Sequence, residues 1–230
     1  MKNIINEKPS YDLHGLRLYS VRFVEDEDVR GKVLLDVGCG YGWFEMNALV
    51  RGCFSIVGIE LTEQDLTTAR DAVKDQRAIF ETGDATKLQF EDGIFDTVVS
   101  WEVLEHIPRR AEQSMFHEVS RVLRNGGCFY LSTPHRSIFS NMFDPAWWIA
   151  GHRHYRVDQI KEFAQRAGFE VEYCEVRGGW WELLWNNNLY VSKWLLRRPP
   201  MFAALIKRLT DREYDRADGF TNIFIKMRKR

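Results

Sequence analysis

The residues best suited to chemistry begin with three glycines at alternate positions in DVGCGYG, namely Gly38, Gly40 and Gly42. A backbone without side chains lets a ligand approach the main-chain N–H groups closely, although a glycine-rich turn can also form without a ligand. A dinucleotide-binding turn needs its third small residue one position later, where this chain has Trp43. The spacing therefore argues against a pyrophosphate. Asp36, just before the glycines, can anchor the turn or approach an amino group.

Two acids follow the next apolar runs. Glu60 closes IVGIE, where a carboxylate can accept hydrogen bonds from both hydroxyls of a ribose, or can simply precede a helix. Asp84 lies in TGDAT, where it can accept a hydrogen bond from an adenine amino group or close an ordinary Asx turn. Because the acids come in this order after the glycines, they favour a nucleoside ligand.

Short apolar runs alternate with helical patterns through much of the chain. The runs are KVLLDV, FSIVGIE, AIFETG, FDTVVSW and CFYLSTP, and the amphipathic segments between them include TEQDLTTARDAVK and RRAEQSMFHEVSRVLR. This alternation predicts an α/β fold with a parallel, doubly wound sheet, in which the loops after each strand share one edge. Two later runs, FEVEYCEV and TNIFIKM, are expected to be strands nearer an edge, the second antiparallel beside the fifth.

The composition is typical of a folded globular domain. A chain of 230 residues can bury a substantial core, and we expect a single domain over residues 1–230. A net charge of −1 gives no basic field, so we predict no nucleic-acid partner. The start MKNIINEKPS has no apolar leader, no run is long enough to span a membrane, and the four cysteines form no CxxC pair. We therefore expect a cytoplasmic protein with reduced thiols.

Five segments resemble, in order, the motifs of class I S-adenosylmethionine-dependent methyltransferases over roughly residues 31–133. They are LLDVGCGYG, GIE, GDA, FDTVVSWEVLEHI and the RVLRNGG turn. Within that class the chain is similar to methyltransferases of type 11 and to quinone-biosynthesis O-methyltransferases. The resemblance implies a seven-stranded, Rossmann-like sheet with a reversed last strand. It also implies S-adenosyl-L-methionine as the methyl donor and S-adenosyl-L-homocysteine as the product.

The upstream segment LHGLRLYSVRFV is similar to a pattern of the quinone-biosynthesis enzymes in which an arginine binds the methionine carboxylate. Arg17 matches that arginine, although the Asn-Pro of the pattern is missing and the spacing is shorter; a surface arginine is the alternative. A planar guanidinium suits bidentate binding of a carboxylate. The predicted cofactor residues are Arg17, Asp36, Gly38, Gly40, Gly42, Glu60, Leu61, Asp84, Ala85 and Trp101.

The residues after the fourth apolar run indicate the class of acceptor. Methyltransferases that act on base or glutamine amines resemble one another in an Asn/Asp-Pro-Pro-Tyr loop at this place, whereas this chain has SWEV at residues 100–103. We therefore expect transfer to a hydroxyl oxygen, or else to carbon, in a biosynthetic reaction. The expected acceptor is a small molecule, or one linked to a lipid or a glycan.

Three histidines are the predicted proton acceptors, because imidazole titrates near neutrality: His106, His135 and His154. His106 could instead pack beside the cofactor, and a structural role is open for each of the three. His152 and Glu102 are further candidates. Glu102 could act together with a metal, but too few ligands can be placed from the sequence, so no metal site is predicted.

Two aromatic-rich segments, residues 135–156 and 180–210, fall outside the alternation and are interpreted as lid insertions over the active edge. They contain six of the eight tryptophans. One interpretation is peripheral contact with a membrane through residues 180–208; packing of the lid or a dimer face is the other, and the oligomeric state is open. Residues 1–30 are expected to form N-terminal cap helices.

Two other functions fit part of the pattern. A nicotinamide-dependent oxidoreductase would also use a glycine-rich turn, but Trp43 and the glycine spacing oppose it. A non-catalytic nucleotide-binding module would have the same pocket without methyl transfer. The presence of Asp36, Glu60 and Asp84 weakens that interpretation.

Overall fold

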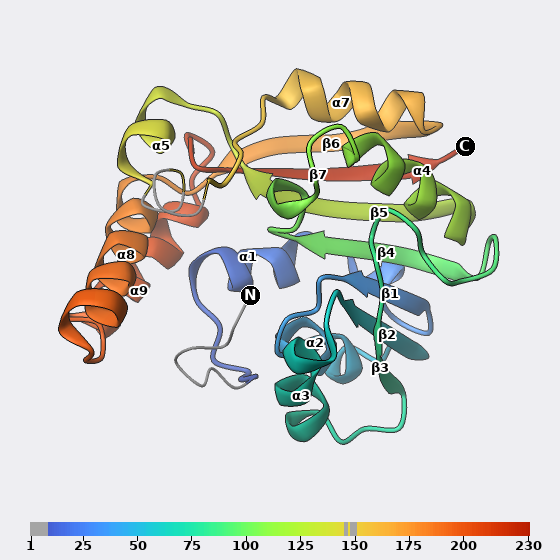
Figure 1. Ribbon diagram of the computed structural model, residues 1–230, viewed down its shortest axis with the longest axis horizontal. Helices are drawn as coiled ribbons and strands as arrows, with labels where there is room; N and C mark the ends of the chain where they lie inside the picture. The colour runs from blue at the N-terminus through green and yellow to red at the C-terminus, as the bar shows by residue number, and fades with distance from the viewer. Residues whose placement is uncertain (1–8, 145–146, 148–150) are drawn as a thin grey trace.

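A seven-stranded sheet runs through the computed structural model, which describes residues 9–144, 147 and 151–230 (Figure 1). The strand order is β3-β2-β1-β4-β5-β7-β6, and β7 runs antiparallel to both of its neighbours. The predicted doubly wound α/β sheet with a reversed last strand is confirmed. The strands are β1 (Val33–Val37), β2 (Ser55–Glu60), β3 (Ala78–Thr82), β4 (Phe95–Trp101), β5 (Leu123–Pro134), β6 (Phe169–Arg177) and β7 (Asn222–Lys229).

Helices cover both faces of the sheet and create two hydrophobic cores. On one face α4 and α7 bury Phe116 and Ile160 against the strands, and on the other α2 and α3 bury Phe44 and Leu66. Strands covered on both faces read as continuous apolar runs, as β1 and β4 do here. The described helices are α1 (Gly15–Phe23), α2 (Trp43–Val50), α3 (Glu63–Ala72), α4 (Glu112–Val122), α5 (Ile138–Phe143), α7 (Val157–Arg166), α8 (Trp180–Tyr190) and α9 (Ala203–Tyr214).

The two insertions lie at the end of the sheet where the parallel strands finish (Figure 1). Helix α8 continues into a short π-helical segment, η3 (Val191–Leu196), and packs against α9. The side-chain amide of Asn187 donates to Phe143 O at 2.9 Å and joins α8 to α5. Trp148, one of the tryptophans of the first insertion, lies outside the described residues.

Within residues 9–30 of the N-terminal segment, the structure describes one α-helix and one short turn. Helix α1 is followed by the 3-10 turn η1 (Asp26–Asp28). The start of α1 is fixed to α9, because Gly15 N donates to Asp211 Oδ1 at 2.6 Å and His14 Nδ1 lies 2.8 Å from Asp211 Oδ2. Among the described helices, none combines the length and the apolar content needed to cross a membrane.

Candidate functional site

The candidate site is a pocket of about 670 Å³ at the carboxyl ends of the parallel strands. Its volume falls within the roughly 300–1,000 Å³ that is usual for ligand and cofactor sites. The chain order reverses between β1 and β4, which is where doubly wound sheets bind their ligands. The predicted cofactor residues that line the pocket are Arg17, Gly38, Gly40, Glu60 and Trp101.

The glycine loop packs closely on one side and leaves open space on the other. Gly38 has φ +83°, and a Cβ built there would come within 2.2 Å of Val103 Cγ2, so only glycine fits. Gly40 lines the pocket with φ +56°, and a Cβ built there would meet nothing within 4 Å. The Gly40 N–H donates to Glu60 Oε1 at 2.8 Å. The loop therefore offers a bare backbone to the pocket, with a carboxylate held beside it.

Arg17 reaches the pocket from α1. Its guanidinium carbon lies 5.0 Å from the centre of the Tyr41 ring, and both residues line the pocket. Stacking on an aromatic face restricts the orientation of a guanidinium. On the same lining, burial raises the pKa of Glu60, while the hydrogen bond from Gly40 N opposes that rise. The glycine loop thus has a cationic group and a carboxyl group beside it.

Asp36 lies outside the pocket lining and is buried together with Glu45, which sequence reasoning missed. Burial, and then the charge of Glu45, raise the pKa of Asp36 well above its usual value, and burial raises the pKa of Glu45 to about 8. Among the described residues, neither Asp36 Oδ1 nor either Glu45 oxygen has a hydrogen-bond partner. Asp36 is therefore placed to support the loop from the protein interior.

The other predicted cofactor residues are also not part of the pocket lining. Asp84 Oδ1 accepts hydrogen bonds from Thr86 N at 2.8 Å and from Thr86 Oγ1 at 2.7 Å, which is an Asx turn. Leu61 is 70% exposed, and Ala85 is buried. Gly42 precedes α2 as its N-cap residue.

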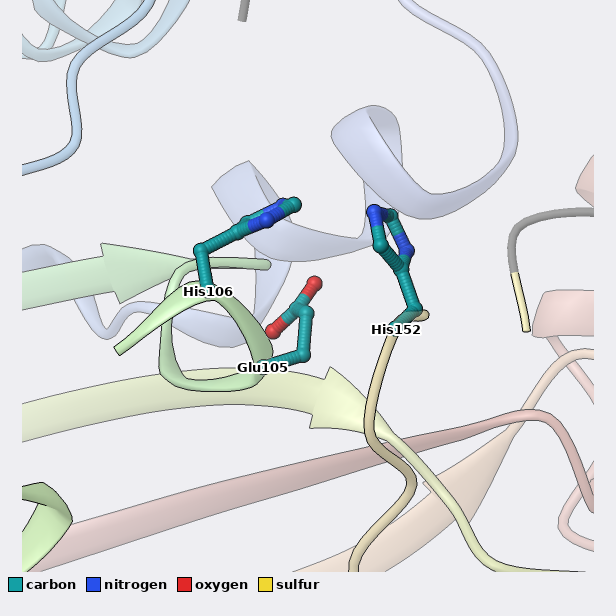
Figure 2. A group of neighbouring side chains, drawn as sticks. All are labelled: Glu105, His106 and His152. Carbon is teal, nitrogen blue, oxygen red and sulfur yellow. The ribbon is translucent and has the colours of Figure 1, made fainter. Parts of the chain in front are cut away.

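His106 lies on the 3-10 turn η2 (Leu104–His106) after β4 and is exposed toward the pocket. Its ring stands perpendicular to that of His152, with the ring centres 4.5 Å apart, and the Glu105 carboxylate lies beside both (Figure 2). Desolvation by the surrounding protein, and then His152, lower the pKa of His106 to about 4, so its imidazole is neutral near pH 7. Sequence reasoning named His106, kept His152 as an alternative and missed Glu105.

The other two predicted bases are held by structural contacts. His154 lines the pocket, but its Nδ1 lies 2.8 Å from Asn141 Oδ1 and its Nε2 lies 3.0 Å from Asp144 Oδ2. His135 is not part of the lining, and its Nδ1 lies 3.2 Å from Phe220 O. His106 therefore lines the pocket, whereas His154 is fixed by its contacts and His135 lies outside the lining.

Further carboxyl groups make much of this wall acidic. Glu102 has φ +55° and accepts a hydrogen bond from Ser132 Oγ at 2.7 Å, and burial raises its pKa to about 7. Glu182 enters the lining from α8, where burial raises its pKa to about 8. The SWEV motif drew attention to Glu102, whereas no sequence signal marks Glu182, because only the packing of α8 brings it to the pocket. Because these pKa values are raised, the carboxyl groups are largely protonated near neutral pH, and such a wall can both donate hydrogen bonds to hydroxyl groups and accept them.

Comparisons with known proteins agree with this fold and site. A family model described as a methyltransferase domain matches residues 35–131. A probable S-adenosylmethionine-dependent methyltransferase of Mycolicibacterium smegmatis is 31% identical over 142 residues, which make up 62% of this chain and 53% of that protein. A ubiquinone biosynthesis O-methyltransferase of Dechloromonas aromatica is 33% identical over 145 residues, or 59% of this chain and 58% of that protein.

The fold is shared over a longer stretch than the sequence. The crystal structure of an S-adenosylmethionine-dependent methyltransferase from Mesorhizobium loti covers 91% of this chain and 96% of its own, with a TM-score of 0.65 at 20% identity. This chain spans a little over half the length of the two curated relatives. Residues 35–131 belong to the methyltransferase domain family, and the sheet and helices around them have the class I S-adenosylmethionine-dependent methyltransferase fold. The resemblance drawn from the motifs is confirmed.

Proposed function

We propose that the chain transfers a methyl group from S-adenosylmethionine to a hydroxyl oxygen of a small molecule, either free or linked to a lipid or a glycan. The observation that carries the proposal is one pocket in which the glycine loop and a wall of carboxyl and imidazole groups face the same space. The name of the relative from Dechloromonas aromatica supports oxygen as the acceptor atom.

The donor would be held by groups that already line the pocket. Arg17 would bind the methionine carboxylate, and Glu60 would accept hydrogen bonds from the ribose hydroxyls. The open space at Gly40 fits a ligand in contact with the loop, because a side chain there would fill that space. Five residues outside the lining keep their cofactor contacts as predictions, namely Asp36, Gly42, Leu61, Asp84 and Ala85.

S-adenosylmethionine, when bound, supplies a methyl group whose bond to sulfur breaks with the electron pair remaining on sulfur. The acceptor oxygen forms the new bond to the methyl carbon as its O–H bond breaks and the proton passes to a base. The chain aligns the two partners, which can contribute roughly 7–11 kcal/mol. Glu102 and His106, both on the segment after β4, are the groups placed to take the proton, which typically contributes about 10²–10⁴-fold.

Methyl transfer is tested with S-adenosylmethionine that carries a trideuterated methyl group, incubated with cell extract and the purified chain. We expect a labelled product in which mass spectrometry and NMR place the methyl group on oxygen. The isosteric variant Glu60→Gln should weaken the binding of S-adenosylhomocysteine in calorimetry, whereas Glu63→Gln, an exposed change three positions along the chain, should not. Label on nitrogen, or no label from a protein that binds the nucleotide, would contradict the proposal.

A lipid-linked form of the acceptor is supported by the surface of the insertions. The exposed apolar side chains on α5, on α8, between α8 and α9 and on α9 include Ile138, Phe139, Trp180, Leu196, Phe202 and Leu205. Arg197 and Arg198 are exposed beside them. Apolar side chains next to basic ones suit the interface of an anionic bilayer. We propose that this surface meets such a bilayer, so that the acceptor reaches the pocket from it.

A further inference from the structure

The first turn of helix α1 is held by one carboxylate of helix α9, from the far end of the chain. Asp211 Oδ1 accepts a hydrogen bond from Gly15 N at 2.6 Å, and Asp211 Oδ2 lies 2.8 Å from His14 Nδ1. The contact is partly buried. The first N–H groups of a helix have no partner within the helix, and a carboxylate beside them is further favoured by the helix dipole. Both oxygens of Asp211 are therefore used to fix where α1 begins.

Close packing around Gly15 fixes the same point. Gly15 has φ +56°, and a Cβ built there would come within 2.9 Å of Thr210 Cγ2 and within 3.3 Å of Glu182 Oε2. Thr210 belongs to α9 and Glu182 to α8, so the first residue of α1 lies against both helices. Glu182 and Thr210 also line the pocket. The helix pair α8–α9 therefore borders the pocket and determines the position of α1 as well.

Arg17 follows Gly15 by two residues, so the start of α1 also determines where its guanidinium lies. The guanidinium carbon is 5.0 Å from the centre of the Tyr41 ring, in the glycine loop, and both residues line the pocket. Burial and the neighbouring carboxyl groups raise the pKa of Glu182 to about 8, and the charge of Arg17 opposes that rise. Because bidentate binding of a carboxylate requires a fixed guanidinium, a shift of α1 would misplace the group that is proposed to bind the donor.

A second contact between α1 and α9 lies at the other end of α1 and is much looser. Arg22 Nη1 lies 3.4 Å from Asp215 Oδ1, and the two side chains are 58% and 63% exposed. Exposed ion pairs of this kind contribute little to stability. The pair lies more than one helical turn beyond Arg17. It therefore offers a matched comparison, because it joins the same two helices without holding the turn that carries Arg17.

We propose that Asp211 is a positioning residue, which holds Arg17 where it can bind the methionine carboxylate of the donor. The helix pair α8–α9 would thereby complete the donor site in addition to its place on the pocket wall. Asp211 is not part of the pocket lining, so it acts through Arg17 and not by contact with the donor. The inference rests on the proposed function, in which Arg17 binds that carboxylate.

The test compares two nucleosides that differ in the group that Arg17 would bind. S-adenosylhomocysteine has an amino-acid tail with a carboxylate, whereas 5′-methylthioadenosine lacks the tail. In calorimetry, Arg17→Ala should weaken the binding of S-adenosylhomocysteine about 10- to 150-fold, and Asp211→Ala should weaken it about fivefold or more. Both variants should bind 5′-methylthioadenosine as tightly as the unaltered chain. The control variant Asp215→Ala should retain the affinity for both nucleosides.

Two further variants separate positioning from general stability. Asp211→Asn should restore most of the affinity for S-adenosylhomocysteine, because its side-chain oxygen can still accept the hydrogen bond from Gly15 N. His14→Ala removes the other partner of Asp211 without altering α9, and it should also weaken the binding of S-adenosylhomocysteine alone. It keeps the inference testable if Asp211→Ala does not fold.

A double variant shows whether Asp211 acts through Arg17. If it does, Arg17→Ala combined with Asp211→Ala should bind S-adenosylhomocysteine no more weakly than Arg17→Ala alone. Additive losses, equal weakening for both nucleosides, or full affinity in folded Asp211→Ala or His14→Ala protein would overturn the positioning role and leave the proposed function standing. Absence of S-adenosylhomocysteine binding by the unaltered chain would contradict the proposed function and overturn the inference with it.

Discussion

The open space at Gly40 makes a sharp prediction about the cofactor. Gly40 and Gly126 both have positive φ, at +56° and +76°, and a Cβ built at either would meet nothing within 4 Å. Gly40 lines the pocket, whereas Gly126 is exposed in the turn at the start of β5. Replacing each by alanine therefore imposes a similar backbone strain, but only the first change adds a methyl group where the ligand is proposed to lie.

The magnitudes of the two effects are expected to differ. Alanine in the left-handed region costs about 1–2 kcal/mol, and about 1 kcal/mol shifts the melting temperature of a chain of this size by roughly 2–4 °C. Both variants should therefore melt roughly 2–8 °C lower. An extra methyl group between two closely packed surfaces costs about 1–3 kcal/mol. The Gly40→Ala protein should therefore bind S-adenosylhomocysteine about 5- to 150-fold more weakly. Gly126→Ala should retain the affinity of the unaltered chain.

Calorimetry with S-adenosylhomocysteine and thermal unfolding monitored by circular dichroism are the assays. If the Gly40→Ala protein binds as tightly as the Gly126→Ala protein, the loop does not contact the nucleotide and the reasoning fails. Equal weakening in both variants would assign the effect to lost stability. Only weakening confined to Gly40→Ala supports the proposed contact between the glycine loop and the nucleotide.

Two further predictions concern stability and the surface. Because the folded-state pKa of Glu45 is about 8, the native chain keeps a proton that the unfolded chain releases above about pH 4.3, and stability falls as the pH rises through that window. Glu45→Gln removes this loss. In urea unfolding, the free energy of unfolding of the variant should rise by roughly 2 kcal/mol relative to that of the unaltered chain between about pH 5.5 and pH 7.5. Parallel pH profiles for the two proteins would refute this. Phe202→Ser should reduce flotation of the chain with anionic vesicles, whereas Phe54→Ser, which is similarly exposed elsewhere, should not. If the unaltered chain does not float and instead dimerises, the exposed apolar surface of the insertions is a dimer face.

Local patterns were enough to predict several residues of the pocket lining beside the glycine loop. The ends of parallel strands lie at one edge of a sheet, so residues that follow β1, β2 and β4 must come near one another once the strands are recognised. Gly40, Glu60 and Trp101 reach the lining for this reason. Asp84 also follows a strand, but it turns back on Thr86, because a short-range Asx turn competes with any contact to a ligand.

The N-terminal helix was harder to place from the sequence. The motif around Arg17 departs from the pattern it resembles, and its spacing does not fix where the helix packs. In the structure α1 is joined to α9, from the far end of the chain, through Asp211. That contact between distant segments brings Arg17 to the glycine loop.

The sequence by itself determined the class of fold, the glycine loop and the acid beside it, because these follow from the alternation of strands and helices and from local backbone needs. Only the tertiary structure decided which histidine and carboxyl groups form the opposite wall of the pocket. It left His135 outside the lining, brought Glu182 into it and set His152 against His106. The insertions that carry His135, His152 and Glu182 have no repeating pattern. Their positions depend on packing and on contacts between segments that are far apart in the chain, such as the hydrogen bond from the Arg153 guanidinium to Leu104 O.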